Sequence, residues 1–137
     1  MLELIEFLQG ELLLTGTLFA LSILLIVNRY SEKFKKYEVV DTNGAVTLMD
    51  DELMILDVRE EKERSAGFID SDLNIQMGQV KSKLGSLDKS KKILVYCKSG
   101  TRSDRIADLL CKNEFQNVYS LKGGFNAWQK AELPIKK

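Results

Sequence analysis

The fold is decided by one stretch, Lys92-Ile93-Leu94-Val95-Tyr96-Cys97-Lys98-Ser99-Gly100-Thr101-Arg102. Its first five residues form an apolar run with β-branched and aromatic members, which predicts a buried strand over residues 92–96. Residues 103–112 place apolar and charged side chains on opposite faces at helical spacing, which predicts an amphipathic helix. Cys97 therefore lies where a buried strand ends and a short loop leads into a helix.

The cysteine of this loop has the expected surroundings of a reactive thiol. A short loop before a helix aims backbone N–H groups and the positive helix end at the Cys97 sulfur, which lowers the thiol pKa. Gly100 allows a turn that other residues disfavour, and Arg102 adds a planar cation suited to an oxyanion. A Cys–His dyad is excluded because the sequence contains no histidine. A lone cysteine at a strand end is often a small packing residue, but the combination of Cys97, Gly100 and Arg102 favours chemistry.

The rest of the chain predicts an α/β domain. Further strands are expected over residues 37–40, 53–58, 73–75 and 117–121. Further helices are expected over about residues 43–49 with Thr42 as the cap, over 60–66, around 77–84, and from 124 to before Pro134. Strands that alternate with helices favour a largely parallel sheet. Ligands of such folds bind beyond the carboxyl ends of the strands, where Cys97 falls.

The stretch Cys-x-x-Gly-x-Arg-Ser after an apolar strand resembles the active-site loop of the single-domain rhodanese family of sulfurtransferases. Additional matches lie on both sides of the loop, and the resemblance covers about residues 37–137. The upstream matches are Leu56-Asp57-Val58-Arg59, Glu63, Gly67, Ile69, Asn74 and Ile75; the downstream matches are Asn117-Val118-Tyr119, Leu121-Lys122-Gly123-Gly124, Ala127-Trp128 and Leu133-Pro134. The sequence departs from the pattern in two places: Phe68 replaces a frequent histidine, and Asp70-Ser71-Asp72 replaces a Pro-Gly-Ala stretch.

The resemblance implies a central, mainly parallel five-stranded sheet flanked by helices, and a persulfide mechanism. The Cys97 thiolate takes the sulfane sulfur of thiosulfate or a related donor, and a thiol or a protein acceptor then removes it. Backbone N–H groups of Lys98, Ser99, Gly100, Thr101 and Arg102 surround the persulfide, and Arg102 orients the anionic donor. Asp57 and Arg59 brace the surrounding loops. The reaction requires neither a cofactor nor a metal ion, and no metal-ligand cluster is visible in the sequence.

Two alternatives use the same cysteine. Protein tyrosine phosphatases and arsenate reductases place a cysteine and an arginine around an oxyanion, and in the phosphatases five residues separate the two. Only four residues, Lys98 to Thr101, intervene here, and a shorter loop makes a narrower cradle, better matched to one sulfur atom than to phosphate. The second alternative is a persulfide carrier or adaptor that serves a protein partner with little turnover of its own.

Composition excludes several other classes of protein. The 137 residues have zero net charge, which gives no support to nucleic-acid binding because such proteins need a basic surface. Two cysteines, Cys97 and Cys111, are too few for a disulfide framework and suit a reducing compartment. Cys111 is expected to be structural and buried. The alternative is a resolving thiol, but the intervening helix separates it from Cys97 by roughly 15 Å, too far for a disulfide.

An N-terminal segment precedes the domain and is expected to be a membrane anchor. Residues 12–27 carry no charge, and as a helix they span roughly 24 Å of a hydrocarbon core of about 30 Å. A signal peptide or a buried core helix is the alternative, but the first residues are acidic and no small-residue cleavage site follows. We therefore expect a transmembrane anchor over 1–28, a basic linker over 29–36, and the domain over 37–137. The basic residues after the span predict a single-pass protein of the cell membrane whose C-terminal domain faces the cytoplasm.

Overall fold

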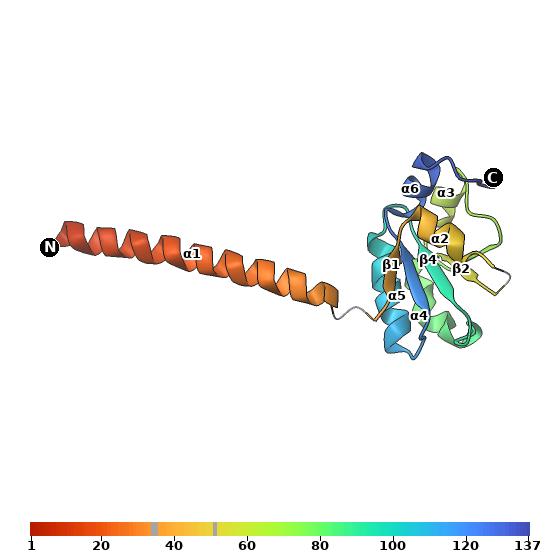
Figure 1. The fold of residues 1–137 in the computed structure, drawn as a ribbon, viewed down its shortest axis with the longest axis horizontal. Helices are drawn as coiled ribbons and strands as arrows, with labels where there is room; N and C mark the ends of the chain where they lie inside the picture. Colours follow the sequence, from red (N-terminus) through yellow and green to blue (C-terminus); the bar gives the residue numbers. More distant parts are fainter. Residues whose placement is uncertain (34–35, 51) are drawn as a thin grey trace. The chain divides into compact units, whose positions relative to one another are not determined.

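The computed structural model describes residues 1–33, 36–50 and 52–137, and the chain divides into two compact units, Met1–Lys35 and Lys36–Lys137 (Figure 1). The first unit contains one helix, α1 (Leu2–Lys33), and the second contains a sheet with its flanking helices. The helix continues through part of the predicted linker as far as Lys33, because no glycine or proline between 28 and 33 interrupts it. Residues 34 and 35 of that linker lie outside the described residues.

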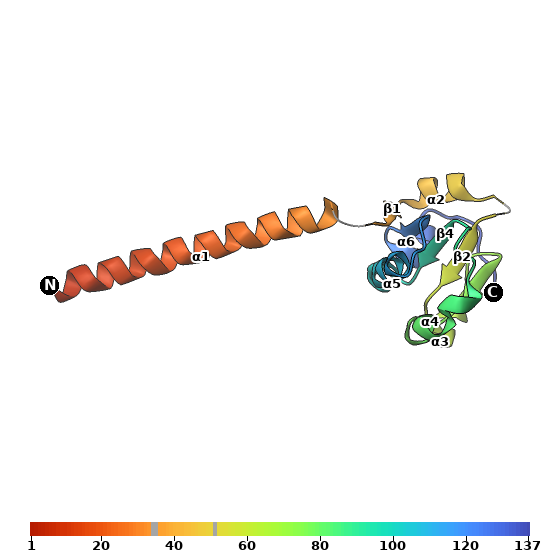
Figure 2. The same ribbon diagram turned by 90° about the horizontal axis from the view of Figure 1, so that it is seen from below.

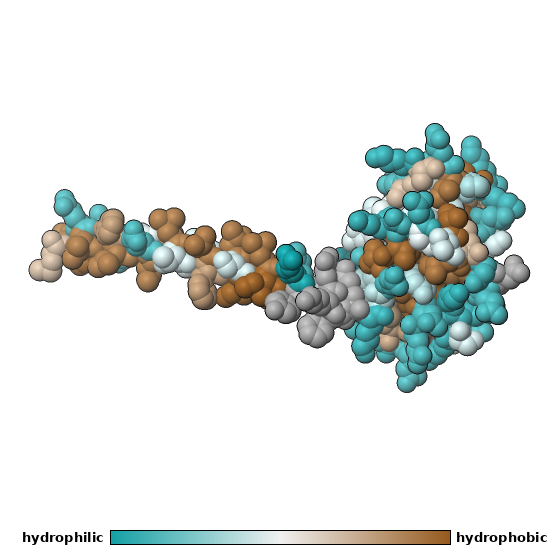
Figure 3. All heavy atoms as spheres, in the orientation of Figure 1, coloured by the Kyte–Doolittle hydropathy of each residue, from teal (hydrophilic) through white to brown (hydrophobic). Residues whose placement is uncertain are grey.

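The helix α1 exposes apolar side chains along most of its length, drawn in brown in Figure 3, with hydrophilic side chains in teal toward its N-terminal end. The segment Leu2–Arg29 is long and apolar enough to cross a membrane. A stretch of 18 residues within it has a mean hydropathy of 2.1, and 0% of that stretch is buried. The alternative of a buried core helix therefore does not fit this segment. A signal sequence near an N-terminus can be as long and as apolar, so both interpretations of α1 agree with the structure.

The second unit is built on the predicted sheet, which is parallel throughout. Its strands are β1 (Glu38–Val40), β2 (Met54–Asp57), β3 (Asp72–Asn74), β4 (Ile93–Tyr96) and β5 (Val118–Leu121). Their order in the sheet is β1-β5-β4-β2-β3, and every neighbouring pair is parallel. The central strand β4 is the apolar run that the sequence places before the loop, and all four of its residues are buried.

Helices cover both faces of this sheet (Figure 2). They are α2 (Thr42–Leu48), α3 (Glu61–Arg64), α4 (Val80–Lys83), α5 (Thr101–Lys112) and α6 (Gly124–Lys130), with 3₁₀ turns over Met77–Gln79 and Leu84–Ser86. Alternate residues of β4 point to opposite faces, as the strand period of two requires. Ile93 and Val95 pack with α4 and α5, whereas Leu94 and Tyr96 pack with α2 and α6.

Two local predictions about helices need correction. Asp41, not Thr42, caps α2, because its carboxylate accepts the Gly44 N–H at 2.8 Å and Thr42 is already helical. The segment around residues 77–84 is not one helix but a single α-turn between two 3₁₀ turns. Neither change alters the sheet or the position of the loop after β4.

Candidate active site

Cys97 follows the last residue of β4 at the carboxyl edge of the sheet, and its side chain is only 1% exposed. The Gly100 N–H donates to the Cys97 Sγ at 3.1 Å, and the Ser103 N–H donates to it at 3.4 Å. The Ser103 Oγ lies 3.6 Å from the same sulfur. The loop and the first turn of α5 therefore converge on Sγ. Gly100 belongs to the predicted donor set of residues 98–102, whereas Ser103 lies outside that set.

These contacts change the ionisation of the thiol. Burial raises the pKa of Cys97, but hydrogen bonds from the backbone and hydroxyl of Ser103 and from the backbones of Gly100 and Ser99 outweigh it. The net pKa lies below the ordinary value of a cysteine. Hydrogen-bond donors therefore favour the thiolate form of this buried cysteine without a histidine.

A pair of glycines holds the loop from the other side. Gly124 has a φ of 59°, and a Cβ on it would lie 2.4 Å from the Cys97 carbonyl oxygen. This close approach lets the first turn of α6 bind the loop: the Phe125 N–H donates to the Cys97 carbonyl at 2.7 Å, and the Asn126 N–H donates to the Lys98 carbonyl at 3.0 Å. The sequence assigned Gly123-Gly124 only to the start of a helix. Two consecutive glycines, one residue after a strand, were the available signal for this contact.

Arg102 makes a contact that the sequence did not suggest. Its guanidinium donates two hydrogen bonds to Glu63, at 2.6 Å to Oε1 and 2.8 Å to Oε2. The hydrogen bond from Arg102 lowers the pKa of Glu63 to about 2, and the Glu63 carboxylate in turn raises the pKa of Arg102. The pair ties α3 to the loop and leaves the remaining N–H groups of the guanidinium as donors for a ligand.

Asp57 and Arg59 lie beneath the site and are almost fully buried, at 0% and 1% exposed. The Arg59 side chain donates to the Asp57 carboxylate at 2.9–3.1 Å and to the Gly67 carbonyl at 2.9 Å. Its guanidinium also lies over the Phe125 ring, 4.2 Å from the centroid. The side chains thus join the end of β2 to the segment after α3 and to α6.

Arg64 strengthens the same region and was missed by the sequence analysis. Its Nη1 donates to Asp57 at 2.8 Å and to Asp72 at 2.6 Å, and Asp72 also accepts a hydrogen bond from the Tyr96 hydroxyl. Arg64 lies over the Phe68 ring, 4.3 Å from the centroid. Phe68 and Asp72, one residue from each of the two departures from the family pattern, therefore contact the same arginine.

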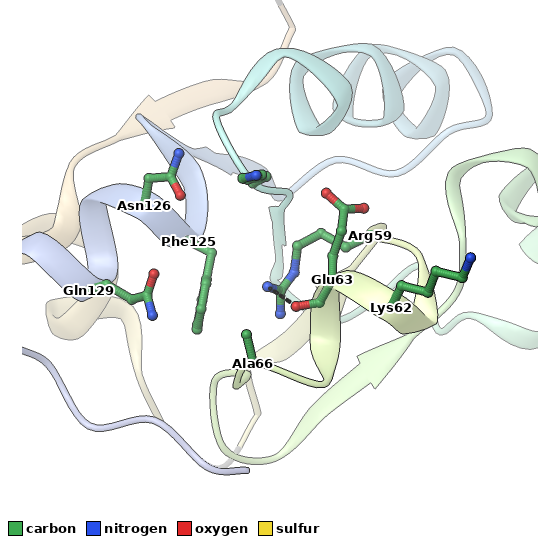
Figure 4. Close-up of a pocket in the computed structure, with 8 residues that line it drawn as sticks. Arg59, Lys62, Glu63, Ala66, Phe125, Asn126 and Gln129 are labelled. Carbon is green, nitrogen blue, oxygen red and sulfur yellow. Dashed lines mark hydrogen bonds between the residues drawn. The ribbon is translucent and has the colours of Figure 1, made fainter.

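A cavity of about 320 Å³ lies beside the loop, between α3 and α6 (Figure 4). Figure 4 shows Phe125 and Gln129 on one side of it and Glu63 and Lys62 on the other. Lys98, the loop residue after the cysteine, also lines the cavity. The cavity is much larger than a sulfur atom and has the dimensions of a small-molecule site.

The other predicted loop residues and the second cysteine occupy different environments. Lys98, Ser99 and Thr101 are exposed, and Gly100 has a left-handed φ of 102°. Cys111 is half-buried near the end of α5, where burial raises the pKa of its thiol. Both cysteines are free in the structure. Within residues 1–33, 36–50 and 52–137, no group of three or more cysteine or carboxylate side chains is placed to hold a metal ion.

Comparisons with known proteins agree with this geometry. The profile of the Rhodanese-like domain matches residues 42–131. The Bacillus subtilis protein YtwF is 36% identical over 85 residues, which cover 62% of this chain and 82% of YtwF. The thiosulfate sulfurtransferase GlpE of Shewanella oneidensis is 34% identical over 79 residues, covering 58% of this chain and 78% of GlpE. The structure of a rhodanese-related protein from Thermoplasma volcanium superposes with a TM-score of 0.69 at 26% identity, covering 73% of this chain and 98% of that one.

Proposed function

Because this chain belongs to the rhodanese family, we propose that it is a sulfurtransferase that carries sulfane sulfur as a persulfide on Cys97. The observation that supports this most directly is the convergence of the Gly100 and Ser103 N–H groups on the Cys97 sulfur. A thiolate needs this kind of donor arrangement when no histidine is present. The resemblance drawn from the sequence is confirmed at the level of the family and the fold.

The first half-reaction loads the enzyme. The Cys97 thiolate attacks the outer sulfur of thiosulfate, a new S–S bond forms, and the bond to the sulfonate sulfur breaks. Sulfite leaves with the electron pair, and the enzyme holds a persulfide with a negative terminal sulfur. The N–H groups of residues 98–102 stabilise that charge, and the remaining donors of Arg102 orient the anionic donor.

The second half-reaction transfers the sulfur to an acceptor. A thiolate attacks the terminal sulfur, and Cys97 leaves as the thiolate from which the cycle began. The cavity beside Lys98 is the proposed position of the acceptor, because it borders the loop and exceeds the size of thiosulfate. Asp57 and Arg59 have no chemical step in this scheme; they hold the walls of the cavity.

The experiment that tests this function compares three readings of the same loop. Turnover of thiosulfate with cyanide or a thiol acceptor supports the sulfurtransferase, whereas turnover of an aryl phosphate or of arsenate would support a phosphatase or arsenate reductase. A carrier or adaptor would accept one sulfur on Cys97 and release it only to a protein partner. The four-residue spacing from Lys98 to Thr101 leads us to expect thiosulfate turnover and no phosphatase activity.

We further propose that α1 anchors the domain in the cell membrane as a single span, with residues 37–137 in the cytoplasm. The exposed apolar surface of α1 supports the membrane span, and the basic residues between positions 29 and 36 support this orientation. The full-length protein should stay in the membrane fraction through high salt and alkaline washing, and removal of residues 1–28 should make it soluble. A processed N-terminus in the mature protein would instead identify α1 as a signal sequence.

A further inference from the structure

A buried serine hydroxyl lies next to the loop that holds the cysteine. Ser120 is in β5, is 0% exposed, and lies one strand from the end of β4. Val118, two residues earlier on the same face of β5, packs into the apolar core beneath α5. A hydroxyl at such a depth needs polar partners, and Ser120 has two: the Ser103 Oγ at 3.0 Å and the Asp104 Oδ1 at 2.7 Å.

These contacts form one continuous chain of polar atoms. It runs from the Cys97 Sγ to the Ser103 Oγ over 3.6 Å, then to the Ser120 Oγ over 3.0 Å, and ends at the Asp104 carboxylate over 2.7 Å. Ser103 and Ser120 are fully buried, whereas Asp104 is partly exposed at the start of α5. The chain therefore links a buried sulfur to a charge at the surface.

The number of available protons decides the direction of donation along this chain of hydrogen bonds. Each serine hydroxyl has one proton to donate, and an ionised carboxylate only accepts. The Ser120 hydroxyl therefore donates to Asp104 and offers only a lone pair to Ser103. The single Ser103 proton then has the Ser120 Oγ, the Gly100 carbonyl at 2.9 Å, and the sulfur as competing acceptors. An ionised Asp104 draws part of that proton's hydrogen bonding away from the sulfur. It thereby weakens the hydrogen bond by which the Ser103 hydroxyl lowers the Cys97 pKa, and so favours the thiol over the thiolate.

We propose that Asp104 and Ser120 are positioning residues that restrain the ionisation of Cys97 by setting the direction of the Ser103 hydroxyl. The inference rests on the proposed function, in which Cys97 is the nucleophile of one half-reaction and the leaving group of the other. A thiol of lower pKa leaves faster but attacks more slowly, and the optimum lies near ambient pH. The Asp104 carboxylate thus favours the thiol form of Cys97, whereas the loop N–H groups favour the thiolate.

Other charged groups near this chain of hydrogen bonds do not set the direction of the Ser103 hydroxyl. Arg102 interacts electrostatically with Cys97 and Glu60, but its guanidinium is paired with Glu63. Tyr37 interacts electrostatically with Asp104; its pKa is raised to about 12 by burial and then by Asp104 and Asp108, so it is neutral near pH 7. Asp108 is itself paired with Lys112 at 2.6 Å, one helical turn beyond Asp104.

The test measures the ionisation of Cys97 and not its sulfur chemistry. Full-length protein carrying Cys111→Ser is kept in detergent, and the rate of Cys97 alkylation by iodoacetamide is followed against pH. Asp104→Asn and Ser120→Ala should each shift the profile to lower pH by about 0.5 to 1 unit. Below the pKa this corresponds to roughly three- to tenfold faster alkylation. The double variant should shift no further than either single variant, because both act through one chain.

Asp108→Asn is the matched control, since it removes a charge from the same helix without touching Ser120; it should leave the profile in place. Unchanged profiles in Asp104→Asn and Ser120→Ala would overturn the proposal. So would shifts that add in the double variant, or a shift in Asp108→Asn equal to that in Asp104→Asn. Alkylation needs no sulfur donor, so a protein with the expected profiles but no persulfide would refute the proposed function alone.

Discussion

The contact between Gly124 and the Cys97 carbonyl is open to a single-atom perturbation. In Gly124→Ala the new Cβ would meet the Cys97 carbonyl oxygen at 2.4 Å and the Lys98 carbonyl carbon at 2.7 Å. Both neighbours are backbone atoms, so α6 and the loop have to move apart. The residue also has a φ of 59°, in the left-handed region that side chains other than glycine disfavour.

The cost of this substitution can be added from its parts. A left-handed conformation costs an alanine about 1–2 kcal/mol. Separation of α6 from the loop also weakens two hydrogen bonds, those of 2.7 Å and 3.0 Å to the carbonyls of Cys97 and Lys98, each worth about 0.5–1.5 kcal/mol. Gly124→Ala should therefore destabilise the domain by about 2–5 kcal/mol, a large share of the roughly 5–15 kcal/mol of an ordinary domain.

The assay is urea unfolding of residues 36–137, followed by the fluorescence of Trp128, the only tryptophan of the chain and 2% exposed. Sulfur transfer from thiosulfate, measured under native conditions, should fall together with stability because the loop itself is displaced. Gly78→Ala is the matched control, since its Cβ would meet nothing within 4 Å and it has no positive φ. A Gly124→Ala domain as stable and active as the Gly78→Ala domain would refute this view of the loop.

Three further predictions concern the loop and its arginine. Arg102→Lys should weaken thiosulfate use, seen as a lower kcat/KM, because an ammonium cannot hold Glu63 and the donor in a planar two-point geometry. The pKa of Glu63 in the folded state is depressed to about 2, so its contribution to stability is present above the ordinary carboxyl pKa and is lost as the pH falls toward 2. Glu63→Gln should remove this pH dependence from the free energy of unfolding measured in urea. An identical pH dependence in both proteins would contradict the prediction. Insertion of a glycine after Gly100 should widen the cradle and cut sulfur transfer by on the order of a hundredfold; wild-type rates would show that loop size does not select the substrate.

The sequence predicted the parts of the fold that depend on local patterns. The apolar run before Cys97 is the central strand β4, and strand and helix alternation led to a sheet that is parallel throughout. The position of the cysteine at the carboxyl edge follows from the same pattern. Most boundaries of the strands and short helices shifted by one or two residues, as expected where helix ends and short strands depend on hydrogen bonds that the sequence does not display. The last helix ends at Lys130 and not just before Pro134, and α1 runs past the predicted anchor to Lys33.

Contacts between segments far apart in the chain could not be predicted in this way. The Arg102–Glu63 pair joins residues 39 positions apart, and the approach of Gly124 to the Cys97 carbonyl depends on how α6 meets the loop. Ser120 gave no signal either, because a single serine in an apolar strand is ordinary until its partners are known. Side-chain charge and size constrain such contacts only after the topology has brought the elements together.

The central claim is that Cys97 carries the transferred sulfur, and intact-protein mass spectrometry tests it most directly. After incubation with thiosulfate, the protein should gain the mass of one sulfur atom, and peptide mapping should place it on Cys97. Cyanide or excess thiol should remove it, Cys97→Ser should abolish it, and Cys111→Ser should leave it intact. Sulfur found on Cys111, or sulfur transfer that survives Cys97→Ser, would contradict the mechanism.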